Sequence, residues 1–157
     1  MARSRLDLPT PLRPSTQVIL PGSALSEMPR KLLCSLSVFD GASPIDAWAN
    51  QRAALDGLLA YGLAIDDGRG GISVPEIARS FALQRVSVET LALLHLDAAN
   101  VREARGEFTA AARHYLEAGQ PSLAIWTWYN RSELETERGH APAARELFRR
   151  LRADELP

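Results

Sequence analysis

The sequence has one cysteine, Cys34, among its 157 residues. A single thiol excludes an internal disulfide, and no spacing of cysteines and histidines in the chain would complete a zinc site. These absences favour a reducing, cytoplasmic setting. Cys34 lies among Leu32, Leu33 and Leu36, so we expect its thiol to be buried and unreactive.

Long hydrophobic runs and an excess of charge are also missing. No apolar run approaches the length that spans a bilayer, and residues 18–20 are too short for the core of a signal peptide. The formal net charge is −1, from 18 basic and 19 acidic residues, so the molecule has no overall field that would attract nucleic acid or anionic lipid. We therefore predict no membrane contact, and any charged partner would need a local patch.

The motifs of nucleotide-binding and metal-binding enzymes are absent as well. No G-x-x-x-x-G-K-[ST] loop occurs, and the GRGG at residues 68–71 lacks the lysine and hydroxyl that hold phosphate and magnesium. Residues 66–67, both aspartate, lack the spaced oxygen ligands of a calcium site. Glu133, Glu135 and Glu137 point to different sides of a helix and fit a solvated face better than a catalytic pair. We predict no enzyme activity, catalytic residue, cofactor or metal site.

Proline content and periodicity divide the chain into three segments. Residues 1–22 hold four of the ten prolines and have no helical period, which predicts a flexible arm. Residues 23–87 combine helical periods with a turn-rich stretch, and residues 88–157 are helical and rich in alanine. The fold class that we predict is therefore mainly α, with two folded parts after the arm.

The middle segment predicts a winged-helix-like domain, which is a set of helices followed by a small β-hairpin. Its apolar spacing and turn residues predict a helix over residues 25–36, a short helix capped by Ser43-Pro44 that runs through Trp48, a helix from Gln51 that stops at Gly62, and a hairpin over residues 63–74 with its turn at residues 67–71.

An internal repeat organises the last segment. Placing Gly106 on Gly139 also places Ala111 on Ala144 and Tyr115 on Phe148, so the sequence repeats at the interval between these two glycines, which we call the repeat period. In each unit a small residue, an aromatic and a second apolar residue follow at i, i+4 and i+7 on one helical face. This pattern predicts an antiparallel array of helices joined by glycine turns.

The stretch GEFTAAARHYLEAG, residues 106–119, resembles the turn and second helix of a tetratricopeptide repeat. W-Y-N at residues 128–130 resembles the first helix of the next repeat, and GHAPAARELF resembles its turn and second helix. The second unit departs at Ala141, where the family has an aromatic, and at Arg131, where the family has leucine. The resemblance covers residues 88–157 and implies two repeats in an array that binds other proteins.

The middle segment resembles the winged-helix domain of signal-transducing ATPases that carry tetratricopeptide sensors. The matching stretches are L-S-V-F-D-G at residues 36–41, L-L-A-Y-G-L-A at residues 58–64 and the helix E-I-A-R-S-F-A at residues 76–82. The resemblance implies a regulatory region without the ATPase domain, because the phosphate loop is missing. Whether the chain is part of such an ATPase or a separate relative stays open.

Two function classes follow from these observations. The first is a non-catalytic protein–protein interaction or regulatory module, and the second is a winged-helix DNA-binding regulator with a dimerisation or effector region in its repeats. The recognition helix for DNA would be residues 51–61, where Arg52 is the only cation, and Arg69 would lie at the wing tip. Duplex recognition draws on several arginine, lysine or asparagine side chains, so we place protein binding first.

The concave surface in this repeat family is lined by the first helix of each repeat. Carried over by position, the resemblance implicates Leu96, Asn100 and Glu103 from the first unit and Trp126, Tyr129 and Glu133 from the second. We predict that Asn100, Trp126, Tyr129 and Glu133 bind a protein partner or mediate self-association. Trp128 and Tyr115 are expected in the core, and the end of the array should expose Leu147, Leu151 and Leu156.

Overall fold

The computed structural model describes residues 26–149 and 151, so the predicted arm at residues 1–22 and the predicted exposure of Leu156 lie outside the described residues. The chain is mainly helical, with a small three-stranded antiparallel sheet. The helices and strands of the first half are α1 (Glu27–Ser37), β1 (Ser43–Pro44), the 3-10 helix η1 (Ile45–Gln51), α2 (Arg52–Ala60), β2 (Ile65–Asp66), β3 (Gly71–Ser73) and α3 (Glu76–Leu83). The second half contains α4 (Val88–Ala104), α5 (Phe108–Glu117), α6 (Pro121–Tyr129), α7 (Ser132–Glu137) and α8 (Ala141–Phe148).

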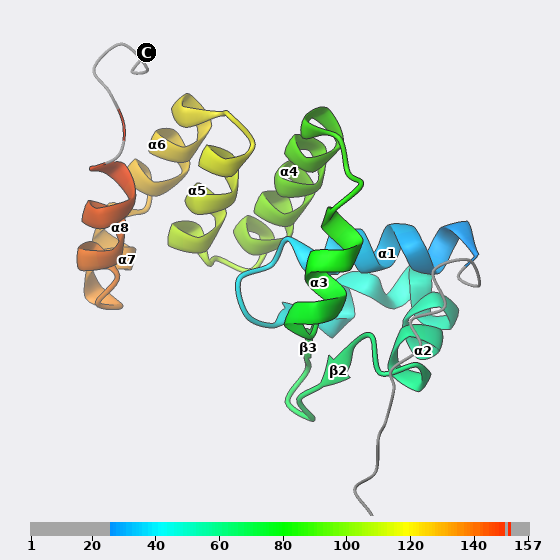
Figure 1. Cartoon of the computed structure of the whole chain (residues 1–157). Helices are drawn as coiled ribbons and strands as arrows, with labels where there is room; N and C mark the ends of the chain where they lie inside the picture. The colour runs from blue at the N-terminus through cyan, green and yellow to red at the C-terminus, as the bar shows by residue number, and fades with distance from the viewer. Residues whose placement is uncertain (1–25, 150, 152–157) are drawn as a thin grey trace, which may run out of the picture.

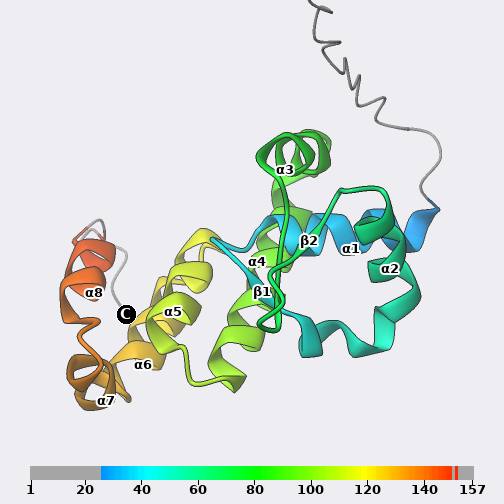
Figure 2. The same ribbon diagram turned by 90° about the horizontal axis from the view of Figure 1, so that it is seen from below.

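The first half, α4 and the remaining helices succeed one another across the molecule. Figure 1 shows α1, α2, α3 and the strands on one side, α4 beside them, and α5 to α8 on the other side. Figure 2 shows the same order from below, with β1 close to α4. None of the helices in the described part of the chain combines the length and apolarity needed to cross a membrane.

The first half forms one hydrophobic core beneath the sheet. Leu32, Leu33 and Leu36 lie on one face of α1 and are buried against Leu55 and other apolar side chains of α2, as the helical spacing predicts. The hairpin forms where the alternating residues predict it, with Ile65 opposite Ser73 in the ladder. The helix over residues 76–82 is present as α3.

The predicted helix cap at Ser43-Pro44 is wrong. These two residues form β1, the third strand of the sheet, and pair with β3 so that Ser43 lies opposite Ile72. The Ser43 hydroxyl is buried and accepts a hydrogen bond from Trp48 Nε1 at 2.7 Å, so it caps no helix. The residue before a proline has extended backbone both in a helix cap and in an edge strand. Pairing with β3, which is distant in the sequence, makes this segment a strand.

The repeat period is present in the backbone of the second half. Gly106 and Gly139 both have left-handed φ angles, of 73° and 81°. The amide of Gly106 donates to the carbonyl of Glu103 at 2.9 Å, and one period later the amide of Gly139 donates to the carbonyl of Thr136 at the same distance. The two turns therefore end their helices in the same way.

The first helix of the second unit is divided, which the sequence comparison did not predict. α6 ends at Tyr129 and α7 begins at Ser132, with Arg131 at φ −127° between them. Glu133 therefore lies on a different helix from Trp126 and Tyr129. The division falls at Arg131.

The two halves share α4. Ala98 belongs to the core of the first half and Ala99 to a second core, whose other members include Ala111, Ala112 and Tyr115 of α5. Consecutive residues of a helix point about 100° apart. Ala98 and Ala99 can therefore pack into different cores from the same helix. Small alanines at these positions allow α4 and α5 to approach closely.

Candidate functional site

Four exposed side chains of α4 have exposed matches one repeat period later, whereas the exposed Val88 and Glu89 at the start of α4 do not. α4 exposes Thr90, Leu93, Asp97 and Asn100, and the matching exposed residues are Leu123, Trp126, Asn130 and Glu133. We call these eight residues, together with the adjacent Tyr129, the first-helix face. The exposed fractions of Leu93 and Trp126, which are matching positions, are 61% and 58%. The repeat therefore presents the same side to solvent in both units.

The four predicted binding residues all lie on the first-helix face. Trp126 and Tyr129 are on α6, Asn100 is on α4 and Glu133 is on α7, and all four are exposed. Among the described residues, no hydrogen bond or ion pair joins any of the four to another. Only Asn100 and Glu133 are matching repeat positions, and the structure does not assemble the four residues into one bonded cluster.

Asn100 is held by the second helix of its own unit. The Tyr115 hydroxyl lies 3.1 Å from Asn100 Oδ1 and 2.8 Å from Glu103 Oε2. Burial and the hydrogen bond to Glu103 raise the pKa of Tyr115 to about 12, so the phenol stays protonated and donates. Tyr115 is buried, as predicted, and its single O–H lies within donating distance of two acceptors on α4, with the Glu103 carboxylate the nearer.

Trp128 and Tyr129 differ in the way that the sequence predicts. Trp128 is half-buried, packs its ring against Phe148 with centroids 5.9 Å apart, and donates from Nε1 to the Thr109 hydroxyl at 3.0 Å. Tyr129 is 68% exposed. Of these two neighbouring aromatics on α6, Trp128 therefore packs against other side chains and Tyr129 lies at the surface.

The surface assignment changes at Leu96 and Glu103, which are both half-buried, and it gains Leu93. Leu96 is half-buried against the second core, whereas Leu93 is exposed and was missed by the sequence analysis. The signal for Leu93 was available, because it precedes Trp126 by one repeat period. At the end of the array, Leu147 and Leu151 are half-buried and therefore less exposed than predicted.

Glu135 was predicted on a solvated face, and this prediction is wrong. Its side chain is 0% exposed. The carboxylate accepts from the Thr109 amide at 2.9 Å, from the Thr109 hydroxyl, from Arg138 at 3.2 Å and from His140 at 3.0 Å. Because Thr109 lies in the first turn of α5, Glu135 supplies an acceptor at that helix N-terminus from across the repeat.

The ionisation of Glu135 follows from these bonds. Burial alone raises the pKa of this carboxyl, but the hydrogen bonds from Thr109 and His140 outweigh it and leave the pKa below its usual value. Glu135 is therefore a charged, fully paired group inside the array. The helix that carries Glu135, α7, begins just after the division at Arg131.

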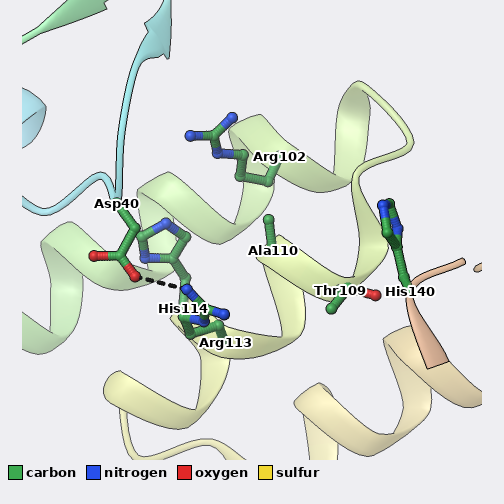
Figure 3. Close-up of a pocket in the computed structure, with 7 residues that line it drawn as sticks. All are labelled: Asp40, Arg102, Thr109, Ala110, Arg113, His114 and His140. Atoms are coloured by element: carbon green, nitrogen blue, oxygen red, sulfur yellow. Dashed lines mark hydrogen bonds and ion pairs between the residues drawn. The ribbon is translucent and has the colours of Figure 1, made fainter. Parts of the chain in front are cut away.

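A cavity of about 180 Å³ lies where the α1–β1 loop meets α5, and Figure 3 shows its lining. The Asp40 carboxylate points toward Arg113 and pairs with it at 2.8 Å. Arg102 forms an ion pair with Glu107 and donates to the Ala42 carbonyl at 2.8 Å. The arginines that line the cavity are thus already bonded to carboxylates or carbonyls of the protein.

Two histidines that are far apart in the sequence meet beside this cavity. Nδ1 of His95 and Nδ1 of His114 are 3.0 Å apart, and the His114 ring packs edge-on against Phe39. Burial, with His95 and Arg102 nearby, lowers the pKa of His114 to about 4. Among the described residues, no hydrogen bond joins either imidazole to a hydroxyl or thiol. The pair therefore has the environment of a neutral, packed group rather than of a base beside a nucleophile.

The remaining candidates offer little chemistry. Arg52, the cation of the candidate DNA-recognition helix α2, pairs with Asp56 at 3.0 Å. The Cys34 thiol is half-buried, lies 3.5 Å from the Ala82 carbonyl, and has a pKa raised by burial. No cluster of three or more metal-ligating side chains occurs in residues 26–149.

The most extensive candidate site is thus the first-helix face, which offers aromatic, aliphatic and polar contacts along α4, α6 and α7. Its polar members supply amide and carboxylate groups, and its apolar members supply contact area. Comparison of the chain with protein-family models, with curated proteins and with solved structures gave no match.

Proposed function

We propose that the protein is a non-catalytic protein–protein interaction or regulatory module that binds its partner through the first-helix face. The observation that carries this proposal is the recurrence of exposed side chains at the repeat period, as at Leu93 and Trp126, with the exposed Tyr129 beside Trp126 on α6. Exposed aromatics often carry a large share of binding energy in protein interfaces. A folded domain gains no stability from leaving such side chains in water.

The arrangement of elements supports a finer assignment. We propose a winged-helix-like domain at residues 23–87, because a helix, a strand, two helices and a hairpin follow one another along the chain. The strand and the hairpin together form one sheet. We propose two tetratricopeptide-like repeats at residues 88–157, because the glycine turns match and the small residues Ala111 and Ala144 are both buried. On this proposal the chain corresponds to the winged-helix and sensor region of signal-transducing ATPases, acting in the cytoplasm.

DNA binding is the second candidate, and the order of elements in the first half is the observation in its favour. The electrostatics oppose it. Arg52 is paired with Asp56, and the formal net charge of the chain is −1. Because counterion release by several unpaired cations drives duplex binding, protein binding has the stronger support.

The proposal is tested by comparing Tyr129→Ala with Trp128→Ala in the full chain. A photo-crosslinking amino acid at position 123 labels partners in extracts of the source cells, and the same amino acid at the exposed Arg145 of α8 is the matched control. Tyr129→Ala should leave the melting temperature nearly unchanged and reduce the yield of proteins labelled from position 123. Trp128→Ala should cost about 3 kcal/mol of stability, because it removes a large side chain that packs against the second core and donates a hydrogen bond to Thr109.

Two results would count against this function. In the first, Tyr129→Ala unfolds the protein as strongly as Trp128→Ala, which would make Tyr129 structural. In the second, the labelled proteins are the same from positions 123 and 145. Binding to one defined DNA duplex at physiological salt, lost in Arg52→Ala, would support the DNA-binding candidate instead.

A further inference from the structure

The charge on the first-helix face is of one sign. Its charged members are Asp97 on α4 and Glu133 on α7, and neither has an ion-pair partner among the described residues. α6 has no charged residue, and the charged residues of α7, with the sequence SELETE, are all acidic. Glu103, which accepts from Tyr115, adds a further carboxylate beside Asn100.

The arginines of the same region are engaged away from this face. Arg102 pairs with Glu107, and Arg105 pairs with Asp46 of the first half. Arg131 lies over the Phe108 ring, 5.5 Å from its centroid. Among the described residues, no ion pair neutralises the carboxylates of Asp97 and Glu133, so they contribute negative potential toward solvent.

The aromatic members of the first-helix face also favour contact with a positively charged group. Trp126 and Tyr129 expose their rings on α6, where the i, i+3 spacing places them side by side. An aromatic ring attracts a guanidinium or ammonium group above its face, and tryptophan does so most strongly. Carboxylates and exposed rings together select cations and disfavour acidic partners.

We propose that the partner segment bound by the first-helix face is basic and carries arginine or lysine beside an aliphatic side chain. This inference rests on the proposed function and adds the chemistry of the ligand. On this proposal, an arginine of the partner segment pairs with Asp97 or Glu133 and stacks on Trp126. The aliphatic side chain contacts Leu93 and Leu123, which are both exposed on this face. Duplex nucleic acid and anionic membranes are repelled by the same carboxylates.

The experiment uses the full chain and a library of random octapeptides on beads, sequenced after selection at low and high salt. We expect arginine and lysine to be enriched, and glutamate and aspartate to be depleted, in the selected peptides. The double variant Asp97→Asn with Glu133→Gln should weaken the best peptide about three- to tenfold at low salt, since each exposed ion pair contributes modestly. Its melting curve should match that of the parent protein.

The matched control is Glu117→Gln. Glu117 is an exposed carboxylate at the end of α5 and lies outside the first-helix face, so this substitution should leave peptide affinity unchanged. An equal loss from Glu117→Gln would show that only the net charge matters, and it would overturn the proposal. Selection of acidic peptides, or of peptides without charge preference, would overturn it as well.

Failure of this inference can be told from failure of the proposed function. If the selected peptides lack basic residues but lose binding in Trp126→Ala and Tyr129→Ala, the ligand chemistry is wrong and the binding face is right. If no peptide depends on Trp126 or Tyr129, both proposals fail. Dimerisation of the full chain in sedimentation experiments that is lost in Trp126→Ala would place a second copy on this face, and that result would also reject the basic segment.

Discussion

At the scale of single residues, the most constrained side chain is Glu135. Its carboxylate is fully buried and accepts hydrogen bonds from α5, from Arg138 and from His140, which precedes α8. Removing one partner from a buried charged network leaves the others unpaired in a poorly solvated place. The stability of the protein therefore depends on the charge of the side chain at position 135 and not only on its size.

We predict that Glu135→Gln destabilises the protein by roughly 3 kcal/mol, because the amide cannot accept from all four donors. Glu133→Gln, two residues earlier and exposed, should change the free energy of unfolding by less than about 0.5 kcal/mol. Urea denaturation at pH 7 measures both. Similar stabilities for the two variants would mean that the Glu135 network contributes nothing.

The paired histidines predict a pH dependence of stability. The pKa of His114 is about 4 in the folded protein and about 6.5 in a model peptide, so the unfolded chain binds more protons between these values. Stability should fall as the pH falls through this window, by about 2 kcal/mol between pH 7 and pH 5. The groups that face His114 are His95, Arg102 and Arg113 with Asp40.

His114→Phe is the test of this assignment. The variant should lose less stability than the parent between pH 7 and pH 5, since it has no imidazole to protonate at this position. Urea midpoints at the two pH values give the comparison. An unchanged pH dependence would assign the effect to other groups. Neither His114 nor Glu135 could be recognised from the sequence as a buried polar group, because His95 lies 19 residues from His114 and Thr109 lies 26 residues from Glu135.

At the scale of elements, most helices and the hairpin were predictable. Their apolar periods and their glycine stops are local signals, and Gly62, Gly106 and Gly139 all have the left-handed φ that a helix end requires. The strand at Ser43–Pro44 and the division between α6 and α7 were not predictable in this way. The first depends on pairing with β3, and the second accompanies the burial of Glu135 against α5.

Two glycines of different backbone conformation provide a prediction at this scale. Gly106 has a φ of 73°, where alanine is strained, so Gly106→Ala should cost about 1–2 kcal/mol. Gly57 lies inside α2 with open space around an added methyl group, so Gly57→Ala should stabilise by about 0.5–1 kcal/mol. Thermal melts of both variants measure the opposite shifts. Shifts of the same sign would contradict the turn assignment.

At the scale of the whole molecule, α4 connects the two cores. Ala98 packs with the first core, which contains Trp48, and Ala99 packs with the second, against which Trp128 packs. Two further residues of the first half are tied to the array by ion pairs, Asp40 of the α1–β1 loop to Arg113 and Asp46 of η1 to Arg105. The two halves therefore should not unfold independently.

We predict one unfolding transition for both halves. A variant that keeps only Trp48 and a variant that keeps only Trp128, with the other tryptophans changed to phenylalanine, report on the two cores by fluorescence. Each fluorescence transition should coincide with the loss of helical circular dichroism in the same variant. A fluorescence transition separated from the helical signal in either variant would show that α4 does not couple the cores.

The shared helix also bears on how such a protein can be assembled by recombination. A gene fusion that joins the first half to a foreign array at residue 87 would remove Ala98, along with Leu91, Leu94 and Val101, from the packing of the first core. A fusion that keeps the first half intact must carry α4 with it, together with an α5 whose small residues fit Ala99. A piece of this chain that is to keep the first half intact must therefore extend at least through α4. It cannot end at residue 87, where the sequence pattern changes.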